Sequence, residues 1–407
     1  MNLWIINQYA SKPNKAGLTR HYELTKRLQF EGIKSLVVHG SFDLYLKSQV
    51  SVENVLGKKT VSYEEFNGVP FLTIPTPPYQ NNKSIGRIAN MLVFRRKAIE
   101  ELKNCKYGKP DIVYGSTMTL FGADAARNLS RHFKVPFVYE VRDLWPLTPI
   151  ELGGYSRWHP FLLYLDYLDR KLAKSADLII TTAPLMKEYY KERFGTPDEK
   201  FLWITNGTDL ELFKVLPDVG ENEEKDTFDI YYAGAHGLAN GLDQIFDQLT
   251  VIMARHPQVR LTLVGDGPLK QHLIERAGKE NLPVRFLDAV PKKELPAILN
   301  KADALLVYLE PCSLYRYGIS LNKLADYHAM GKPILFVGDC AENPVIQSGA
   351  GMVAKTIEEF PSIVEKMIRM NPEEKKLMGE KGRSYAEENY NWEKLAKITS
   401  DTLKGLL

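Results

Sequence analysis

Residues 229–249 read DIYYAGAHGLANGLDQIFDQL and carry the pattern that decides the fold. A short run of apolar and aromatic residues, Asp229–Tyr232, leads into a turn with three glycines in eight residues, at Gly234, Gly237 and Gly241. Apolar residues at helical spacing then follow the turn. A strand, a glycine turn and an amphipathic helix in succession form the first half of a βαβ unit, which predicts a parallel sheet.

The same alternation of short strands and helix-length segments runs through the whole chain. In the first half we expect strands at Leu3–Ile6, Ser35–Val38, Phe71–Ile74, Ile112–Tyr114, Phe137–Val141, Leu178–Thr181 and Phe201–Ile204. In the second half we expect strands at Asp229–Tyr232, Arg260–Val264, Val284–Phe286, Ala304–Tyr308 and Pro333–Phe336. The sequence therefore predicts an α/β protein with two doubly wound, Rossmann-like domains.

The alternation breaks near residues 206–224, where an Asn-Gly pair and the polar run ENEEK occur. We place an N-terminal domain at residues 1–205 and a second domain at residues 206–391. A last helix, at about residues 392–407, is expected to cross back onto the first domain. Open parallel sheets bind ligands at the carboxyl ends of their strands, so two facing sheets would place a site in the cleft between the domains.

Composition excludes several classes of protein. The chain has 407 residues, of which 44% are hydrophobic and 25% charged, as in ordinary globular proteins. Its apolar runs reach only five or six residues before a charge, which is too short for a membrane span. The N-terminus resembles a first strand and not a signal peptide, so we expect a cytoplasmic protein. Cys105, Cys312 and Cys340 lie far apart, and neither a disulfide framework nor a metal site is expected.

Charge is divided unequally along the chain. Residues 1–205 hold 29 Lys and Arg against 20 Asp and Glu, whereas residues 206–407 hold 24 against 30. Much of the positive excess lies at residues 81–109, where apolar residues recur at roughly helical spacing: Ile85, Ile88, Leu92, Ile99 and Leu102. This basic helix fits either a solvated surface helix or peripheral contact with an anionic membrane. No aromatic platform accompanies it, so we expect no nucleic-acid partner.

Two glycine-containing loops are candidate phosphate sites. The first strand runs into a loop in which Gly17 precedes a helix, and a helix start offers free N–H groups to an anion. The loop with Gly234 and Gly237 suits a diphosphate better than a simple turn, although it is neither a GxGxxG nor a Walker loop. His236, in the same loop, is either a capping histidine or a contact to the bound ligand.

A third cluster spans residues 315–333, where Ser320 is expected to cap a helix with Lys323 in its first turn. A cation near a helix start is unfavourable by itself, which indicates that an anion belongs there. Arg316 and Lys323, together with the helix start, could hold a diphosphate. Asp326, one turn later, could accept hydrogen bonds from ribose hydroxyls or could simply pair with Lys323.

The strand expected at Phe137–Val141 ends in charged residues. Glu140, Arg142 and Asp143 stand where a parallel sheet presents its loops. Buried charges at a strand end are costly unless they have a partner or a role. We therefore favour a functional site there over a purely structural ion pair.

Taken in order, several segments resemble the retaining GT-B glycosyltransferases of family 4. Within that family the resemblance is to the L-fucosamine-type and colanic-acid-type transferases of bacterial surface polysaccharide synthesis. The segments are AGLTRHYELTKRL, EVRDLWP, ITNGTDLELF, YYAGAHGLANGLD, LVGDGPLKQHL, FLDAVPKKELPAILNKADALLVYL and GISLNKLADYHAMGKPIL.

The resemblance implies a GT-B fold in which two Rossmann-like domains clamp a sugar nucleotide and pass the sugar to an acceptor with retention. It places Asp326 at the family's ribose-binding acid, and Gly318, Ser320 and Leu321 at its phosphate-facing helix start. It implies Gly17 near the diphosphate and sugar. The donor is expected to be a UDP-sugar, with no metal or other cofactor, and the acceptor a glycan or a lipid-linked sugar.

The chain departs from the family pattern at three points. Arg142 stands before Asp143 where many members have a histidine, so no catalytic histidine is transferred. The Arg and Lys that often follow the second glycine loop are missing, and Arg316 and Lys323 are the candidates to replace them. Gly318 stands where an acid is common, and Glu310 is an uncertain substitute.

The mechanism expected from these residues is electrostatic. Arg316, Lys323 and the glycine loops would stabilise the departing diphosphate, while Arg142 and Asp143 would orient the sugar or the acceptor hydroxyl. Two alternatives stay open at this point: an epimerase or hydrolase acting on a sugar nucleotide, and a non-catalytic subunit that binds one.

Overall fold

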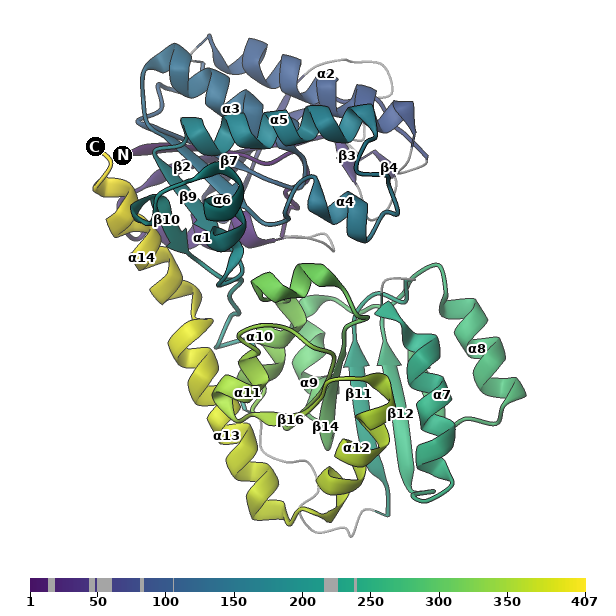
Figure 1. Ribbon diagram of the computed structural model, residues 1–407. Coiled ribbons are helices and arrows are strands. Elements are labelled where there is room, and N and C mark those ends of the chain that lie inside the picture. Colours follow the sequence, from purple (N-terminus) through teal and green to yellow (C-terminus); the bar gives the residue numbers. More distant parts are fainter. Residues whose placement is uncertain are drawn as a thin grey trace. The chain divides into compact units, whose positions relative to one another are not determined.

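Each half of the chain forms an open, mainly parallel β-sheet with helices on both faces (Figure 1). The structure is a computed structural model that describes residues 1–13, 19–43, 48–49, 61–80, 84–104, 106–215, 226–237 and 240–407. Contacts divide the chain into unit 1, Met1–Thr205 with Trp392–Leu407, and unit 2, Asn206–Asn391. Each unit is built around its own sheet.

The sheet of unit 1 has the spatial order β10-β9-β8-β7-β1-β2-β6-β5. Its strands are β1 (Asn2–Ile6), β2 (Lys34–Gly40), β5 (Ser62–Phe66), β6 (Val69–Ile74), β7 (Ile112–Ser116), β8 (Phe137–Val141), β9 (Leu178–Thr181) and β10 (Phe201–Trp203). All neighbours pair in parallel except β5, which runs antiparallel to β6 at the edge. A separate two-stranded ribbon joins β3 (Phe42–Asp43) and β4 (Ser48–Gln49). The order outward from β1 is that of a doubly wound sheet.

Helices cover both faces of this sheet. They are α1 (Arg20–Leu28), α2 (Ile85–Leu102), α3 (Leu120–Phe133), α4 (Leu147–Glu151), α5 (Pro160–Ser175), α6 (Met186–Phe194) and α14 (Trp392–Lys404). Figure 1 shows α2, α3 and α5 side by side on one face. On the other face, α1 and α14 bury Leu24, Leu28, Trp392 and Leu403 against β1, β7, β8 and β9.

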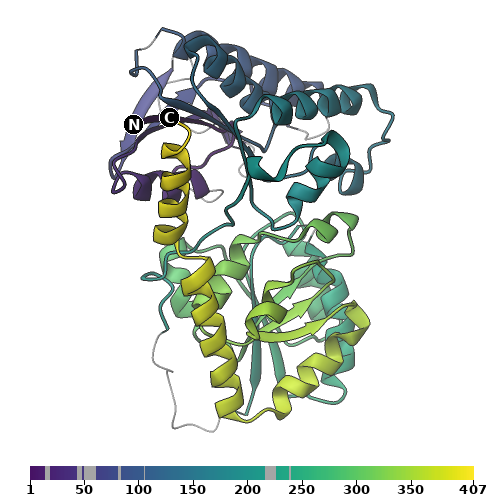
Figure 2. The ribbon, with the colours of Figure 1, turned by 60° about the vertical axis from the view of Figure 1, so that its left-hand side comes forward.

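The last helix therefore belongs to unit 1, although it follows unit 2 in sequence. Met1 and Leu406 pack against the same apolar cluster, and the two chain ends lie near each other (Figure 2). Trp392 is almost fully buried in this cluster. Burying a side chain of that size contributes about 2–3 kcal/mol, which is enough to hold the chain end in place.

The basic helix expected near residues 81–109 is present as α2. Its buried face is formed by Asn90, Met91, Phe94, Ala98 and Leu102, so of the five apolar residues whose spacing indicated the helix only Leu102 is buried. Ile85 and Leu92 are exposed. Two polar side chains of α2 bond to neighbouring elements: Arg95 donates to Asp124 of α3, and Asn90 accepts from Gln8 after β1.

The sheet of unit 2 has the order β13-β12-β11-β14-β15-β16, and all its pairs are parallel. Its strands are β11 (Phe228–Ala233), β12 (Val259–Val264), β13 (Val284–Leu287), β14 (Ala304–Tyr308), β15 (Ile334–Val337) and β16 (Gly351–Ala354). Counted from β11, this is the 3-2-1-4-5-6 order of the Rossmann fold. The strand order reverses between β11 and β14, and in such sheets ligands bind beyond the carboxyl ends of these two strands.

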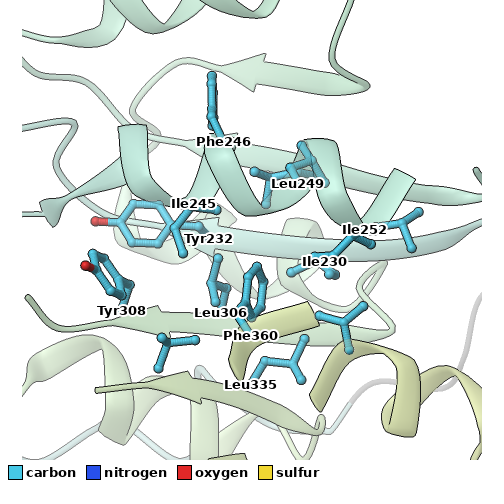
Figure 3. Close-up of a cluster of buried hydrophobic side chains, with 14 of the residues drawn as sticks. Ile230, Tyr232, Ile245, Phe246, Leu249, Ile252, Leu306, Tyr308, Leu335 and Phe360 are labelled. Atoms are coloured by element: carbon cyan, nitrogen blue, oxygen red, sulfur yellow. The ribbon is translucent and has the colours of Figure 1, made fainter. Parts of the chain in front are cut away.

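The helices of unit 2 are α7 (Leu242–Met253), α8 (Lys270–Lys279), α9 (Leu295–Leu299), α10 (Asn322–Ala329), α11 (Pro344–Ser348), α12 (Phe360–Arg369) and α13 (Pro372–Asn389). Figure 3 shows one half of the core, to which α7 contributes Ile245, Phe246 and Leu249 and the sheet contributes Ile230 and Leu306. On the opposite face, α10 and α13 pack together and bury Leu324, Tyr327 and Ala386.

All twelve strands expected from the sequence are present. The edge strands β5 and β16 were not expected, because Ser62–Phe66 is mostly polar and Gly351–Ala354 begins with a glycine. The prediction of two doubly wound α/β domains is confirmed. Within the described residues, no helix is long and apolar enough to span a membrane.

Candidate functional site

The loop after β11 is the centre of the candidate site in unit 2. Gly234 follows the last residue of β11, and its N–H donates to the Val264 carbonyl at 2.9 Å. A Cβ at Gly234 would stand 2.8 Å from Lys323 Nζ and 3.0 Å from the Tyr232 hydroxyl. A larger residue would therefore occupy the space that holds the lysine ammonium, which is a physical reason for glycine at this position.

The loop after β12 supports this turn by direct contact between backbones. A Cβ at Gly265 would lie 2.0 Å from the Gly234 carbonyl oxygen. The His236 N–H donates to the Asp266 carbonyl at 2.9 Å, and the Leu269 N–H donates to the His236 carbonyl at 3.0 Å. The two loops thus form one hydrogen-bonded layer at the carboxyl edge of the sheet, and a site built on it is positioned rigidly.

Lys323 reaches this layer from the first turn of α10. Its Nζ lies 3.9 Å from the centroid of the Tyr232 ring, and burial lowers its pKa to about 7. Among the described residues no carboxylate pairs with it. A cation–π contact offsets only part of the cost of placing an ammonium here. A negatively charged ligand at this position would supply the counter-charge that Lys323 lacks.

The start of α10 differs in detail from the sequence prediction. Ser320 was expected to cap the helix, but the N-cap is Leu321, whose side chain makes no capping bond. The Ser320 Oγ instead accepts from the Asn206 N–H at 3.1 Å, and the Ser320 carbonyl accepts from Asn206 Nδ2 at 2.8 Å. The Ser320 hydroxyl oxygen, which was expected to cap the helix, thus bonds to Asn206 instead. The first N–H groups of an α-helix have no partner within the helix, and those of α10 start beside Lys323.

Asp326 lies on α10 one turn after Lys323, and the two do not form the ion pair considered as an alternative. Its Oδ1 accepts from Thr208 Oγ1 at 2.7 Å and lies 3.2 Å from Lys292 Nζ. Burial raises its pKa, while Lys292 and Thr208 oppose that shift. Oδ2 has no hydrogen-bond donor among the described residues, so one carboxylate oxygen stays available.

Arg316 is not brought to Lys323 by any contact in the described part of the chain. Its side chain is exposed, and Nη2 donates to the neighbouring Tyr317 hydroxyl at 2.6 Å. Gly318 follows with φ +81°, a conformation that favours glycine. Glu310 lies closer to the glycine loop, because Gln244 Nε2 donates to its Oε1 at 3.0 Å and a Cβ at Gly241 would touch it.

His236 and Gly237 lie on the same loop. The His236 ring is fully buried, and neither of its nitrogens has a hydrogen-bond partner among the described residues. Burial lowers its pKa, with Lys270 adding to the effect, so the ring is neutral. The Gly237 N–H donates to Asn240 Oδ1 at 3.3 Å. Because both nitrogens are buried, the His236 ring packs under the loop and supports it. The ring would have to rotate before it could contact a ligand directly.

The predicted site residues of unit 1 follow β8. The N–H groups of Arg142 and Asp143 both point to Thr117 Oγ1, at 2.7 Å and 3.4 Å. Burial raises the pKa of Asp143, and Arg142 opposes that shift. Thr117 thus holds the backbone of both residues at the carboxyl end of the sheet. Gly17 lies outside the described residues.

Glu140, which precedes them, is the centre of a buried network that sequence reasoning did not find. Its Oε1 accepts from Arg20 Nε at 2.8 Å and from the Tyr114 hydroxyl at 2.7 Å, and His21 Nε2 lies 2.8 Å from its Oε2. Burial alone would raise the pKa of Glu140, but Arg20 and His21 hold it well below its usual range. For Glu140, the structural ion pair is the role that the contacts support.

Arg20 links this network to the end of unit 1. Its guanidinium also donates to the carbonyls of Ile204, at 2.8 Å, and Thr205, at 2.5 Å. The sequence held a signal for these residues, since Arg20 and His21 begin a helix, where cations are unfavourable without an anionic partner. The partner was a glutamate 120 residues away, which only folding brings near.

Acidic, cysteine and histidine side chains do not gather in the described residues as the ligands of a metal would. The candidate site therefore rests on one unpaired ammonium, a helix start and two glycine loops. Such a combination binds phosphate groups.

Comparisons with known families agree with this geometry. A family model described as Glycosyltransferase Family 4 matches residues 19–212, and one described as Glycosyl transferases group 1 matches residues 227–370. The first model covers most of unit 1 and runs into the start of unit 2, and the second lies within unit 2. Glycogen synthase of Mycobacterium tuberculosis is 22% identical over 309 residues, which cover 74% of this chain and 70% of that protein.

Solved structures show the same fold. Sucrose-phosphate synthase from Thermosynechococcus elongatus is similar with a TM-score of 0.75 at 17% identity, covering 100% of this chain and 98% of the other. Anabaena HepE in complex with UDP and glucose is similar with a TM-score of 0.68 at 16% identity, covering 100% of both chains. E. coli trehalose-6-phosphate synthase, bound to UDP-2-fluoro glucose, has a TM-score of 0.72 at 11% identity over 99% of each chain.

Proposed function

We propose that this chain, a glycosyltransferase of the GT-B fold, transfers a sugar from a UDP-sugar to a glycan or lipid-linked acceptor with retention of anomeric configuration. The observation that carries the proposal is Lys323, an ammonium without a carboxylate partner in the described chain, which stands beside Gly234 at the start of α10. A diphosphate supplies the missing negative charge.

The choice of UDP has support from related folds. HepE and the trehalose-6-phosphate synthase were solved with UDP, glucose or a UDP-sugar analogue. In this chain, Asp326 Oδ2 is placed on the same helix as Lys323, one turn further on. We propose that Asp326 accepts a hydrogen bond from a ribose hydroxyl while Lys323 holds the diphosphate. Glu310, beside the glycine loop, is proposed to contact the donor sugar.

The chemistry follows from where charge develops. As the glycosidic bond breaks, negative charge gathers on the departing UDP, and preorganised donors that face it lower the barrier. Lys323 and the first N–H groups of α10 supply those donors. With the acceptor on the same face as the leaving group, a phosphate oxygen can take the acceptor proton, so no separate strong base is needed. The exposed side chain of Arg316 is proposed to turn from the Tyr317 hydroxyl toward the diphosphate when the donor binds.

Acceptor binding is assigned to unit 1, where Arg142 and Asp143 end a strand. The raised pKa of Asp143 suits a group that exchanges a hydrogen bond with a neutral hydroxyl. The acceptor class proposed is that of bacterial surface polysaccharides: O-antigen, capsule or exopolysaccharide precursors.

A membrane-facing surface on unit 1 would fit a lipid-linked acceptor. Trp158 and Tyr167 are 74% and 59% exposed, and Leu163 and Tyr164 lie between them on the first turns of α5. The same segment holds Arg157, Arg170, Lys171 and Lys174, while Asp166 is engaged by Arg193 and Asp169 is buried. Aromatic residues flanked by cations are typical of helices that lie at a membrane interface.

This surface replaces the apolar stripe of α2 that the sequence suggested. Ile85 and Leu92 of α2 are also exposed. We propose a cytoplasmic protein that attaches peripherally to anionic lipid. Co-sedimentation with anionic vesicles at low salt tests this: Trp158→Ser and Tyr167→Ser should each reduce binding, while Phe30→Ser, an exposed aromatic on another helix end, should not. Binding that ignores lipid charge would contradict the proposal.

The first experiment on the reaction is a thermal-shift panel with UDP, GDP, dTDP, ADP and CMP, each with and without Mg²⁺ and with EDTA. A ligand that binds only the native state raises its melting temperature by mass action. The proposal expects a shift with UDP that is independent of metal and absent in Lys323→Met. A shift with another nucleotide, or a strict need for Mg²⁺, would contradict the donor or the metal-free mechanism.

Turnover separates the remaining classes. With a UDP-sugar and an acceptor, the transferase forms a glycoside in which the anomeric configuration is retained. Release of free sugar or of an epimer without acceptor would indicate a hydrolase or epimerase, and UDP binding without turnover on any acceptor would indicate a binding subunit.

A further inference from the structure

Unit 1 contains a cavity of about 570 Å³ that lies away from the carboxyl ends of its strands. Asn2 and Lys34, the first residues of β1 and β2, stand at its edge, so the cavity opens at the amino ends of these strands. Arg142 and Asp143 follow the carboxyl end of β8 in the same sheet. The cavity is therefore separate from the glycosyl-transfer site proposed above and does not depend on it.

Two aromatic side chains form one wall. The rings of Tyr63, on the edge strand β5, and Tyr107, after α2, are stacked with an interplanar angle of 8° and centroids 6.0 Å apart. Tyr63 is 53% exposed, so one ring face remains open. Trp4 and Leu36 pair across β1 and β2 and line the cavity floor. An open aromatic face carries partial negative charge and attracts the C–H-rich face of a sugar ring.

The rim is positively charged. Lys34 and Lys106 are exposed lining residues, and neither forms an ion pair with a described carboxylate. Lys106 Nζ lies 5.5 Å from the centroid of the Tyr107 ring. No acidic residue is among the described residues that line the cavity. Two acids outside the lining contact lining residues: Glu101 accepts from the Tyr107 hydroxyl at 3.1 Å, and Asp111 accepts from the Asn2 N–H at 2.7 Å.

The lining side chains of β1 and β2 all lie on one face of the sheet. Lys34 and Leu36 share the face of Trp4, because side chains alternate along a strand. Ser35, between them, points to the opposite face, where Ile33 and Val37 pack toward α1, so its hydroxyl does not enter the cavity. The cavity thus combines an aromatic platform and two cations, which is a composition that suits a small charged ligand.

We propose that this cavity is a second saccharide site that binds a pyranose with one negative charge, either a carboxylate or a phosphate. The sugar ring stacks on Tyr63, and its charged group lies between Lys34 and Lys106. Such a site would hold an acidic sugar of a growing glycan at a distance from the reacting end.

The test is calorimetric titration of the full chain with glucuronic acid, glucose 6-phosphate, neutral glucose, inorganic phosphate and UMP, in the presence of saturating UDP. UDP occupies the site proposed in unit 2, so binding that persists with UDP present belongs elsewhere. At least one charged sugar should bind about tenfold more tightly than glucose, a difference of about 1.4 kcal/mol, and inorganic phosphate should not displace it. The better of the two charged sugars identifies the carboxylate or the phosphate as the natural group.

Variants assign the binding to this cavity. Tyr63→Ala and the double change Lys34→Ala with Lys106→Ala should each weaken binding about tenfold, while Tyr63→Phe keeps the ring and should bind like the original protein. The matched controls are Phe30→Ala, an exposed aromatic residue after α1, and Lys279→Ala, an exposed lysine of unit 2. Tyr63 is on an exposed edge strand, so an unchanged melting temperature is expected.

Equal affinity for glucose and the charged sugars would overturn the proposal. So would unchanged binding in Tyr63→Ala, or binding of UMP alone that is lost in Tyr63→Ala, because that would make the cavity a nucleotide site.

Discussion

Lys323 Nζ lies 3.9 Å from the centroid of the Tyr232 ring, on the side where Gly234 leaves room for it. The two residues come from α10 and β11, which Tyr327 also joins by accepting a hydrogen bond from the Ala233 N–H at 2.7 Å. The lysine is thus held by the sheet itself and not by a flexible loop. A ligand that binds it meets a cation whose position is already set.

Replacing this lysine should separate stability from activity. Lys323→Met removes a cation that burial disfavours, so the free energy of unfolding should rise by about 1 kcal/mol after allowance for solvent screening. The rate of sugar transfer should fall about 100-fold, because the leaving diphosphate loses its counter-charge. Chemical denaturation and steady-state kinetics measure the two effects, with the exposed Lys279→Met as control. A variant that is both less stable and fully active would rule out this role.

The pH dependence of stability follows from the same residue. The pKa of Lys323 is about 7 in the folded protein and 10.5 in the unfolded chain. Between these values the unfolded state binds more protons, so the contribution of Lys323 to stability rises as the pH increases from about 7 to about 10. Its destabilising effect is greatest below pH 7. The stability difference between Lys323→Met and the original protein should therefore be largest at pH 6 and shrink above pH 8.

Donor binding should change with pH in the opposite direction. A diphosphate favours the charged form of Lys323, so the affinity for a UDP-sugar should fall as the pH rises through about 7. The diphosphate of a UDP-sugar does not titrate between pH 6 and 8.5, so a slope in that range belongs to the protein. Calorimetry in two buffers of different ionisation enthalpy should show proton uptake on binding. A flat profile in the original protein would contradict a direct contact between Lys323 and the diphosphate.

The contact between Asn206 and Ser320 should affect donor binding more than folding. Ser320→Ala removes one acceptor of the Asn206 N–H just before α10, so the helix start should become less well positioned. We expect the KM for the UDP-sugar to rise about tenfold with a small change in kcat, and Ser320→Thr, which keeps a hydroxyl, to restore it. The exposed Ser362→Ala on α12 is the control. A loss of melting temperature with unchanged KM would indicate a purely structural contact.

Asp169, deep in unit 1, should make stability depend on pH. Its Oδ1 accepts from the Tyr139 and Tyr190 hydroxyls at 2.7 Å and 3.0 Å, and its Oδ2 has no hydrogen-bond partner among the described residues. Burial raises its pKa to about 7. Between about pH 4 and pH 7 the folded state binds more protons, so this group makes stability fall as the pH rises. Asp169→Asn should flatten that part of the denaturation profile. An identical slope in the variant would show that the carboxyl stays ionised.

The pattern of short apolar strands and glycine turns in the sequence determined the two Rossmann-like sheets and the strands nearest their centres. Runs such as Ala304–Tyr308 have a local cause, because a strand buried on both faces must be apolar throughout. The chain divides after Thr205 and after Asn391, where the alternation of the sequence also breaks. The cation at the start of α10 was visible for a similar reason, since Lys323 is unfavourable there without a ligand.

Tertiary structure decided what depends on residues far apart in sequence. In the sequence Glu140 is one of three charges at a strand end, but Arg20 and His21 pair with it in a buried structural network. Ser320 was expected to cap α10, but its hydroxyl accepts from the Asn206 N–H instead. The buried face of α2 depended on α3 and the loop after β1, and the cavity lined by Tyr63 and Tyr107 depended on an edge strand with a polar sequence. The local sequence pattern indicates which residues must be buried. The partners of polar and charged side chains are determined only when the folded sheet brings distant segments together.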